Sequence, residues 1–492
     1  MEPASTGCLR SALAAGDLIE TAAENTPIIV DLDETLFLRN STEEYLNSLQ
    51  PRPLGAALLL ALDVLKPWHW LLRSIRGERS RDWMRVVIAT MFFPWTLMLW
   101  PKRAERLAAL HKNPILLAAL NKTRSKRKVL ATLGFAPIVA PIVRHLGVDW
   151  TAVIACRFWR GAMDRGKGKL ALVEATLGPE VVARAVLVTD PSEESELGGR
   201  VATLCCIMWP GARYIAAMSD VYVPFTYIEK VKHSKIRYVR DVILGDDIPL
   251  ILLASSWISP EPILHAVAVV LLVFSFWCIY EAGYYENDKV AERFEEDPVL
   301  SQEYENYERR ITFWSTQGWA IAIAIPGLAL LQFSVPHEEE MRKVLELFSY
   351  ATAIWLGFLL CVRLTFWCYN RVDKHTRSWI YPLLQSYRYF GCLTVTSTNL
   401  FGAMLLIAQV LARWFPYLVY RYVGGEWREV PVFLMRWVIL LFLMIAIMLG
   451  SEGNSGVMSW QVLAIILYCT FRARKQLWGI MREARPITRV VE

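Results

Sequence analysis

The sequence lacks the features that mark metal-rich, disulfide-rich or nucleic-acid-binding proteins. Its nine cysteines form no C-x-x-C pair and its seven histidines do not cluster, which argues against a zinc site or a disulfide framework. The net charge is only +6, and the basic clusters lie beside apolar segments, which favours a membrane surface over nucleic acid. Residues 1–25 contain no long apolar run, so we expect no signal peptide and a disordered N-terminal tail.

Hydrophobic residues are abundant instead, at 54% of the chain with a mean hydropathy of +0.30, and the excess lies after about residue 246. Several apolar runs there are close to the roughly 20 residues that a membrane-spanning helix needs. These runs lie near 248–258, 262–285, 311–334, 346–368, 379–411, 432–450 and 457–471. We therefore expect a soluble front end, a basic connector over 223–245, an all-α polytopic membrane bundle over 246–476 and a C-terminal tail over 477–492.

A short apolar strand that ends in two aspartates gives the front end its chemistry. The segment 28-IIVDLDETLF-37 delivers Asp31 and Asp33 to the loop after the strand, where parallel α/β sheets place their sites. One carboxylate can attack phosphorus, while the second protonates the leaving oxygen and later deprotonates water. A magnesium ion would hold the phosphate against this anionic pair. An Asp-x-Asp at a strand end can also be only a turn or a helix N-cap.

The segment resembles the first motif of the haloacid dehalogenase (HAD) superfamily of phosphohydrolases. The resemblance covers roughly residues 26–222 and implies an α/β domain with a Rossmannoid parallel sheet. It also implies Asp31 as the nucleophile, Asp33 as the general acid and base, and Mg²⁺ as a cofactor that both carboxylates help to hold.

Two later segments resemble further HAD motifs in the expected order. In 128-KVLATLGFAPIVAPI-142 the resemblance places Thr132 at a strand end, where its hydroxyl would bind a phosphoryl oxygen. In 164-DRGKGKLALVE-174 the family's lysine, which neutralises charge between nucleophile and phosphate, is either Lys169 or Lys167. Lys169 is favoured because the apolar residues that follow it fit the family pattern better.

The segment 184-RAVLVTDPSEESEL-197 resembles the fourth HAD motif. It implies Asp190 as a magnesium ligand, with Glu194 four residues later as a second acidic group. Many family members have Gly before this aspartate and a second Asp, where this chain has Thr189 and Glu194. The departure retains carboxylate chemistry but changes the metal ligands.

Residues 36–127, between the first two motifs, are long enough for an inserted helical cap. Its runs 55-GAALLLALDVLKPWHWLL-72 and 84-MRVVIATMFFPWTLMLWP-101 are strongly apolar, and the basic stretch 73-RSIRGERSR-81 separates them. Such helices suit a cap that lies in the interface of an anionic leaflet, where it would present lipid phosphates to Asp31. A cap packed onto its own domain fits the pattern equally well.

Two polar stretches between apolar runs could carry chemistry in the bundle: 284-YYENDKVAERFEEDP-298 and 369-YNRVDKHTR-377. Each has an Asn and an Asp at a helix end, and facing acidic pairs could hold a diphosphate through magnesium, with basic neighbours adding positive charge. Charged loops are also common on membrane proteins without any such role. The candidate diphosphate-binding residues are Asn287, Asp288, Asn370, Asp373 and Lys374.

These stretches resemble the UbiA family of intramembrane prenyltransferases, over roughly residues 240–480. Members usually place another Asp three residues after the first Asn-Asp, where this chain has Ala291, with Glu292 and Asp297 as the nearest acidic residues. The usual bundle also has more helices than the apolar runs found here. Fusion of a HAD phosphatase to a UbiA-like bundle is a known arrangement, and some relatives make polyprenyl-phosphate sugars from phosphoribosyl diphosphate.

The sequence leaves three functional hypotheses open. In the first, a bifunctional enzyme transfers a prenyl or phosphoribosyl group to or from a polyprenyl (di)phosphate, and the HAD domain removes a phosphate from the product. In the second, only the HAD site is active, on a lipid or sugar phosphate, and the bundle is an anchor. In the third, the chain is a non-enzymatic transporter or scaffold.

We expect an integral, multi-pass membrane protein whose HAD domain lies on the cytoplasmic side, where magnesium and phosphorylated metabolites are available. Its expected partners are the lipid bilayer and a polyprenyl or lipid phosphate substrate. Neither nucleic acid nor an obligate protein partner is expected.

Overall fold

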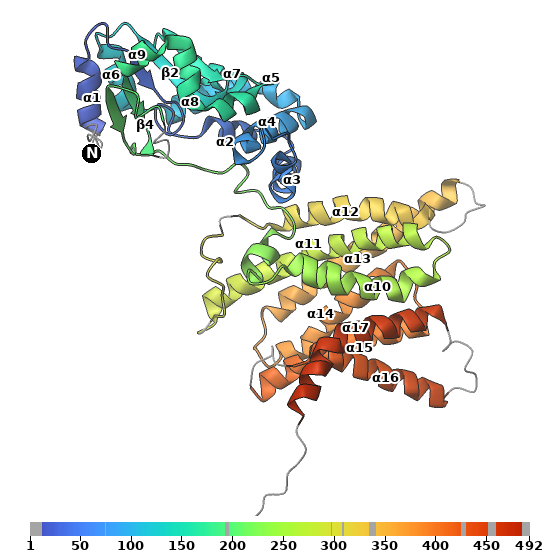
Figure 1. Ribbon diagram of the computed structural model, residues 1–492. Helices are drawn as coiled ribbons and strands as arrows, with labels where there is room; N and C mark the ends of the chain where they lie inside the picture. The colour runs from blue at the N-terminus through green and yellow to red at the C-terminus, as the bar shows by residue number, and fades with distance from the viewer. Residues whose placement is uncertain are drawn as a thin grey trace, which may run out of the picture. The chain divides into compact units, whose positions relative to one another are not determined.

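The structure is a computed structural model, shown in Figure 1, in which the chain divides into two compact units. The first comprises Met1–Val223 and the second Pro224–Glu492. The described residues are 12–73, 75–191, 196–296, 298–307, 309–333, 341–424, 430–450 and 459–484.

The N-terminal unit contains a five-stranded parallel sheet with the strand order β3-β2-β1-β4-β5. Both neighbours of the central strand run parallel to it, in registers that pair Ile29 with Val129 and with Leu187. The strands are β1 (Ile28–Val30), β2 (Lys128–Phe135), β3 (Ala152–Cys156), β4 (Val186–Thr189) and β5 (Thr203–Cys206). The α/β fold class predicted from the sequence is confirmed.

Alternate residues of the central strand pack into different cores. Ile28 and Val30 belong to one apolar cluster, and Ile29 belongs to a second one. Because successive side chains of a strand point to opposite faces, these clusters cover the two faces of the sheet. Burial on both faces explains why the strand reads as an unbroken IIV run.

The insertion between β1 and β2 is helical, as expected. It comprises α2 (Ser41–Leu46), α3 (Arg52–Leu65), the short turns η1 (Pro67–His69) and η2 (Glu78–Ser80), α4 (Arg81–Phe92), α5 (Trp95–His111) and α6 (Pro114–Lys122). The chain bends by 113° between the segments 78–92 and 95–111. Pro94 lies at this bend, where it cannot donate a backbone hydrogen bond to continue the preceding helix. After the insertion follow α7 (Ala136–Arg144), α8 (Gly161–Leu177) and α9 (Pro179–Ala183).

The N-terminal tail was expected to be disordered over residues 1–25, but α1 (Ala12–Thr21) occupies part of it. Ala15 and Ile19, four residues apart and therefore on one helix face, are both fully buried in the core of the N-terminal unit. The burial of this apolar face stabilises a helix that was not expected because the tail has no long apolar run.

The C-terminal unit is all-helical (Figure 1). Its main helices are α10 (Ile248–Ser255), α11 (Pro262–Phe294), α12 (Phe313–Phe333), α13 (Met341–Tyr369), α14 (Arg377–Phe390), α15 (Leu400–Tyr422), α16 (Val432–Gly450) and α17 (Trp460–Glu483). From Pro224 onward the expected connector belongs to this unit. It contains the helical turns η4 (Ile228–Lys232) and η5 (Val239–Asp247). The fully buried carboxylate of Glu281 accepts hydrogen bonds from the backbone N–H groups of Phe225, Tyr227 and Ile228 at 2.8, 2.8 and 2.9 Å.

Within the described residues, five helices are long and apolar enough to cross a membrane, which indicates a membrane protein. The qualifying segments are 262–294, 313–332, 342–369, 400–422 and 432–450. The segments 78–92 and 95–111 of the N-terminal unit would make a sixth candidate span if the two bent helices together were one broken span. The expected run 379–411 is broken between α14 and α15, and α10, in the run 248–258, has only 8 residues. The expected C-terminal tail begins within α17.

Candidate active site

Asp31 follows β1 directly and is almost completely buried. Its backbone N–H donates to the carbonyl of Val188 at 2.9 Å, which extends the contact between β1 and β4 beyond the strand. Its Oδ1 atom accepts a hydrogen bond from the backbone N–H of Leu32 at 2.8 Å and lies 2.8 Å from Nζ of Lys169. The side chain is therefore fixed in position and held beside a cation.

Lys169 reaches Asp31 from α8, and a glycine explains its direction. The helix is kinked at Gly168, whose φ of 83° is in the region that favours glycine. Lys169 is buried, with 5% of its side chain exposed, whereas Lys167 is exposed. Of the two lysines that the sequence left open, the structure places Lys169 at the aspartate.

Asp33 is held by donors from two different elements. Its Oδ1 accepts a hydrogen bond from the backbone N–H of Ser41, at the start of α2, at 2.6 Å. Its Oδ2 accepts one from the hydroxyl of Thr132 at 3.4 Å. Thr132 Oγ1 in turn accepts the backbone N–H of Gly134 at 2.9 Å.

Thr132 was expected at a strand end, but β2 continues past it to Phe135. The pairing of β2 with β3 shifts register between Ala131 and Phe135, so the ladder is irregular at the threonine. Such an irregularity re-aims a side chain within a strand. The threonine can therefore reach Asp33 without the strand ending.

Asp190 follows β4, the neighbour of β1, and is 6% exposed. Glu194, the expected second acidic group, lies outside the described residues. No group of three or more His, Cys, Asp or Glu side chains in the described part of the chain is close enough to hold a metal ion. Magnesium, however, is commonly bound by only one or two carboxylates together with waters and substrate phosphates. The carboxylates of Asp31, Asp33 and Asp190 fit that role in their chemistry.

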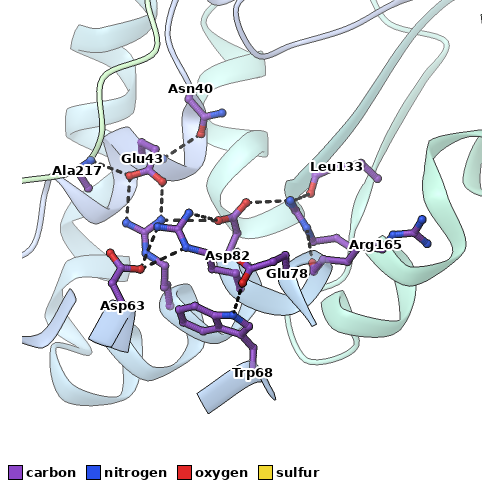
Figure 2. A network of polar contacts seen from close by, with 12 residues as sticks. Asn40, Glu43, Asp63, Trp68, Glu78, Asp82, Leu133, Arg165 and Ala217 are labelled. Atoms are coloured by element: carbon purple, nitrogen blue, oxygen red, sulfur yellow. Dashed lines mark hydrogen bonds and ion pairs between the residues drawn. The ribbon is translucent and has the colours of Figure 1, made fainter. Parts of the chain in front are cut away.

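A polar network with a buried ion pair at its centre ties the inserted helices to the sheet domain, as Figure 2 shows. The Arg85 guanidinium on α4 pairs with Glu43 on α2 at 2.6 Å, and both side chains are 3% exposed. The second Glu43 oxygen accepts the backbone N–H of Ala217 at 2.7 Å. Asp82 pairs with Arg165 of α8 at 2.8 Å (Figure 2). Glu43 belongs to none of the motifs found in the sequence. Only the fold shows that it connects the inserted helix α4 to the backbone at Ala217.

A second polar region lies in the helical unit, in a cavity of about 1050 Å³. Asn287 and Asp288 line this cavity, together with cationic and tyrosine side chains. Asn370, Asp373 and Lys374 are not among the lining residues, so the structure does not bring the two expected groups to one cavity.

Asp373 and Lys374 of the second polar stretch have partners that do not line this cavity. The hydrogen bond from the Thr376 hydroxyl lowers the pKa of Asp373 to about 2, and the same carboxylate accepts the backbone N–H groups of His375 and Thr376 at 2.9 and 3.0 Å. Lys374 pairs with Glu295 at 3.3 Å. Asp373 thus stabilises the turn that precedes α14. In the first stretch Glu292 accepts a hydrogen bond from the hydroxyl of Tyr304 at 2.8 Å, and Asp297 lies outside the described residues.

The N-terminal unit combines a parallel sheet, an aspartate pair after its central strand and a buried lysine, which is the architecture of an aspartate-based phosphohydrolase. Residues 28–190 match the family model of the haloacid dehalogenase-like hydrolases, so this unit contains a HAD domain. The match does not extend into the helical unit. The comparisons with curated proteins and with solved structures gave no match.

Proposed function

We propose that the N-terminal unit hydrolyses a phosphate monoester by way of an aspartyl phosphate. The observation that carries this proposal is the 2.8 Å pairing of Lys169 with Asp31, beside an Asp33 held by Ser41 and Thr132. The family match supports the reaction class.

In the first step an Asp31 carboxylate oxygen forms a bond to phosphorus as the bond to the ester oxygen breaks. Asp33 gives its proton to that leaving oxygen. Asp33 then takes a proton from water, whose oxygen attacks phosphorus and releases Asp31 with inorganic phosphate. Lys169 and Thr132 bind phosphoryl oxygens. Mg²⁺, bound by one or two of the carboxylates of Asp31, Asp33 and Asp190 together with waters and the substrate phosphate, would supply charge neutralisation for the phosphoryl group.

The test is magnesium-dependent phosphate release by the purified full-length protein from a panel of sugar and prenyl phosphates. Asp31→Asn should abolish release because an amide cannot form the aspartyl phosphate. Asp17→Asn, on an exposed position of α1, is the matched control and should keep full activity. Release that survives in Asp31→Asn would refute this assignment.

For the helical unit we propose transfer of a prenyl or phosphoribosyl group to or from a polyprenyl (di)phosphate, whose product the HAD domain dephosphorylates. The cavity with Asn287 and Asp288 on its wall favours this over a role as anchor alone. With Asp31→Asn protein, which preserves phosphorylated products, label from phosphoribosyl diphosphate should enter the polyprenyl phosphate fraction. If no label or prenyl group is transferred, the proposed transferase activity is refuted.

We further propose that the inserted helices contact the lipid bilayer on the cytoplasmic side. Apolar side chains on α3, α4 and α5 and in the turns between α3 and α4 are strongly exposed. Exposed arginines lie in the same turns. The exposed apolar side chains include Val64, Trp70, Leu72, Phe92 and Met98, with exposures between 65 and 82%. An environment-sensitive dye on a cysteine at Met98 of the reconstituted protein should be quenched by brominated lipid. A dye at the exposed Trp159, outside the insertion, is the control.

A further inference from the structure

The cavity of the helical unit is lined by an excess of positive charge. Five of its side chains are cations at neutral pH: Lys232, Lys235, Arg388, Arg413 and Arg421. Among the described residues on its wall, Asp288 is the one carboxylate. Tyrosines supply much of the remaining surface, with Tyr280, Tyr284, Tyr381 and Tyr417 among them.

The carboxylate on this wall already has cationic and phenolic partners. Oδ1 of Asp288 lies 2.5 Å from Nζ of Lys232, and its Oδ2 accepts a hydrogen bond from the hydroxyl of Tyr227 at 2.7 Å. To coordinate a magnesium ion, Asp288 would have to exchange these buried interactions for metal bonds. No further Asp or Glu lines the cavity within the described part of the chain. The donor set therefore does not fit the carboxylate-held magnesium that the two polar stretches of the sequence predicted.

Two arginines of the wall are positioned by buried carboxylates from η5. Arg388 makes a bidentate pair with Asp247, with both bonds at 2.8 Å, and Arg413 lies 3.5 Å from Asp246. Asp246 is shared with Arg436 at 2.9 Å and Arg472 at 3.4 Å. Four arginines thus surround two carboxylates, which leaves this end of the unit cationic.

Two other cations of the wall have no such partner. Within the described residues, no carboxylate lies within 4.0 Å of the Arg421 guanidinium or the Lys235 ammonium. Arg421 lies over the rings of Tyr417 and Tyr420, at 5.1 and 5.0 Å from their centroids. Stacking of this kind fixes the plane of a guanidinium and leaves its edge available for two parallel hydrogen bonds to a phosphate.

We infer that this cavity binds a phosphate or diphosphate ester directly through its arginine and lysine side chains, without a metal ion, and packs the organic part of the ester against its tyrosines. Charge-assisted hydrogen bonds to phosphate are about twice as strong as neutral ones, so the cations can replace magnesium as the counter-charge. This goes beyond the proposed transfer, because it specifies how the ligand is held. Ligand binding of this kind does not require that transfer occurs.

The test is equilibrium binding of labelled inorganic pyrophosphate to full-length Asp31→Asn protein in detergent. Binding should persist in EDTA, and added magnesium should weaken it by neutralising the ligand. The double variant Lys235→Gln/Arg421→Gln should weaken binding in EDTA at least tenfold. Asp288→Asn should bind as tightly as its parent or more tightly, because it removes a negative charge from the wall.

Arg371→Gln is the matched control for the loss of a cation. Arg371 is an exposed arginine of the same unit, stacked over Trp367 at 4.1 Å and outside the cavity wall, and its variant should bind like the parent. Displacement by polyprenyl phosphate in micelles or by phosphoribosyl diphosphate in solution identifies the source of the phosphate. Binding that needs magnesium and is lost in Asp288→Asn would overturn the inference. So would no binding, or equal binding by the double variant and the control. Phosphate release and group transfer are measured separately, so their failure is distinguishable.

Discussion

Replacing Lys169 by methionine removes the cation at the proposed nucleophile and keeps all but the terminal atom of the side chain's length. The 2.8 Å separation of Lys169 Nζ and Asp31 Oδ1 corresponds to a Coulomb energy of about 6 kcal/mol at an effective dielectric constant of about 20. Much of this interaction exists before substrate binds, so it does not all appear in the rate. Removing one preorganised charge-stabilising group costs about 3–4 kcal/mol in other enzymes. We therefore expect kcat to fall by about 10²–10³-fold.

The assay is phosphate release with saturating substrate, followed by the dependence on substrate concentration. Lys167→Met is the control, because Lys167 is exposed and two residues away on the same helix. It should keep kcat within about threefold, since exposed ion pairs contribute little. The assignment of Lys169 would be refuted if Lys169→Met kept its rate and Lys167→Met lost it. A change in KM alone would show that Lys169 stabilises the bound substrate and the transition state equally.

Two further predictions concern the stability of the N-terminal unit. Arg85→Met leaves the Glu43 carboxylate, which is 3% exposed, without its guanidinium and should destabilise the unit by about 3–5 kcal/mol, measured as faster thermal inactivation of phosphate release. The double variant Arg85→Met/Glu43→Gln should recover part of this loss of stability. If the single and the double variant lost the same stability, the pairing would be contradicted. The Arg157 guanidinium lowers the pKa of Asp164 below 3.8, so the stabilisation by this carboxylate is fully present above pH 3.8 and is lost as pH falls through its folded pKa. Asp164→Asn should therefore reduce the acid dependence of the thermal midpoint below about pH 4, and an unchanged dependence would contradict this.

The strand that delivers Asp31 and Asp33 was predictable from the sequence because its signal is local. Three buried β-branched residues followed by Asp31 and Asp33 specify a buried strand and the loop after it, and the structure has both. The choice between Lys169 and Lys167 also depends on a local feature, the backbone of Gly168, but a positive φ is not visible in the letters GKGK. The sequence favoured Lys169 from its apolar neighbours, and this is the lysine that lies beside Asp31, but the kink that directs it there was not predicted.

Long-range pairing explains what the sequence could not show in the N-terminal unit. Glu43 and Arg85 are 42 positions apart, on different helices of the insertion, and no spacing rule links them. The helix α1 was missed for a similar reason, since its stability comes from burial of Ala15 and Ile19 in a core built by distant segments. Tertiary burial stabilises this helix although the tail lacks the long apolar run whose absence led to the prediction of disorder.

In the helical unit, too, the sequence could not show which residues distant segments bring together. Asn287 and Asp288 attract attention because an Asn-Asp pair after an apolar run resembles a known motif, and they do line the cavity. Two of the cations on its wall, Lys232 and Lys235, come from the connector that the sequence showed to be basic. The other three are arginines of α14 and α15, where no spacing pattern in the sequence marks them as members of one site. The motif therefore pointed to two residues of the cavity wall, but only the fold shows that most charged side chains on this wall are positive. Five cations against one carboxylate make an anion the natural ligand, and the partners of Asp288 make metal coordination by this residue costly. Pyrophosphate binding in EDTA distinguishes these two chemistries directly.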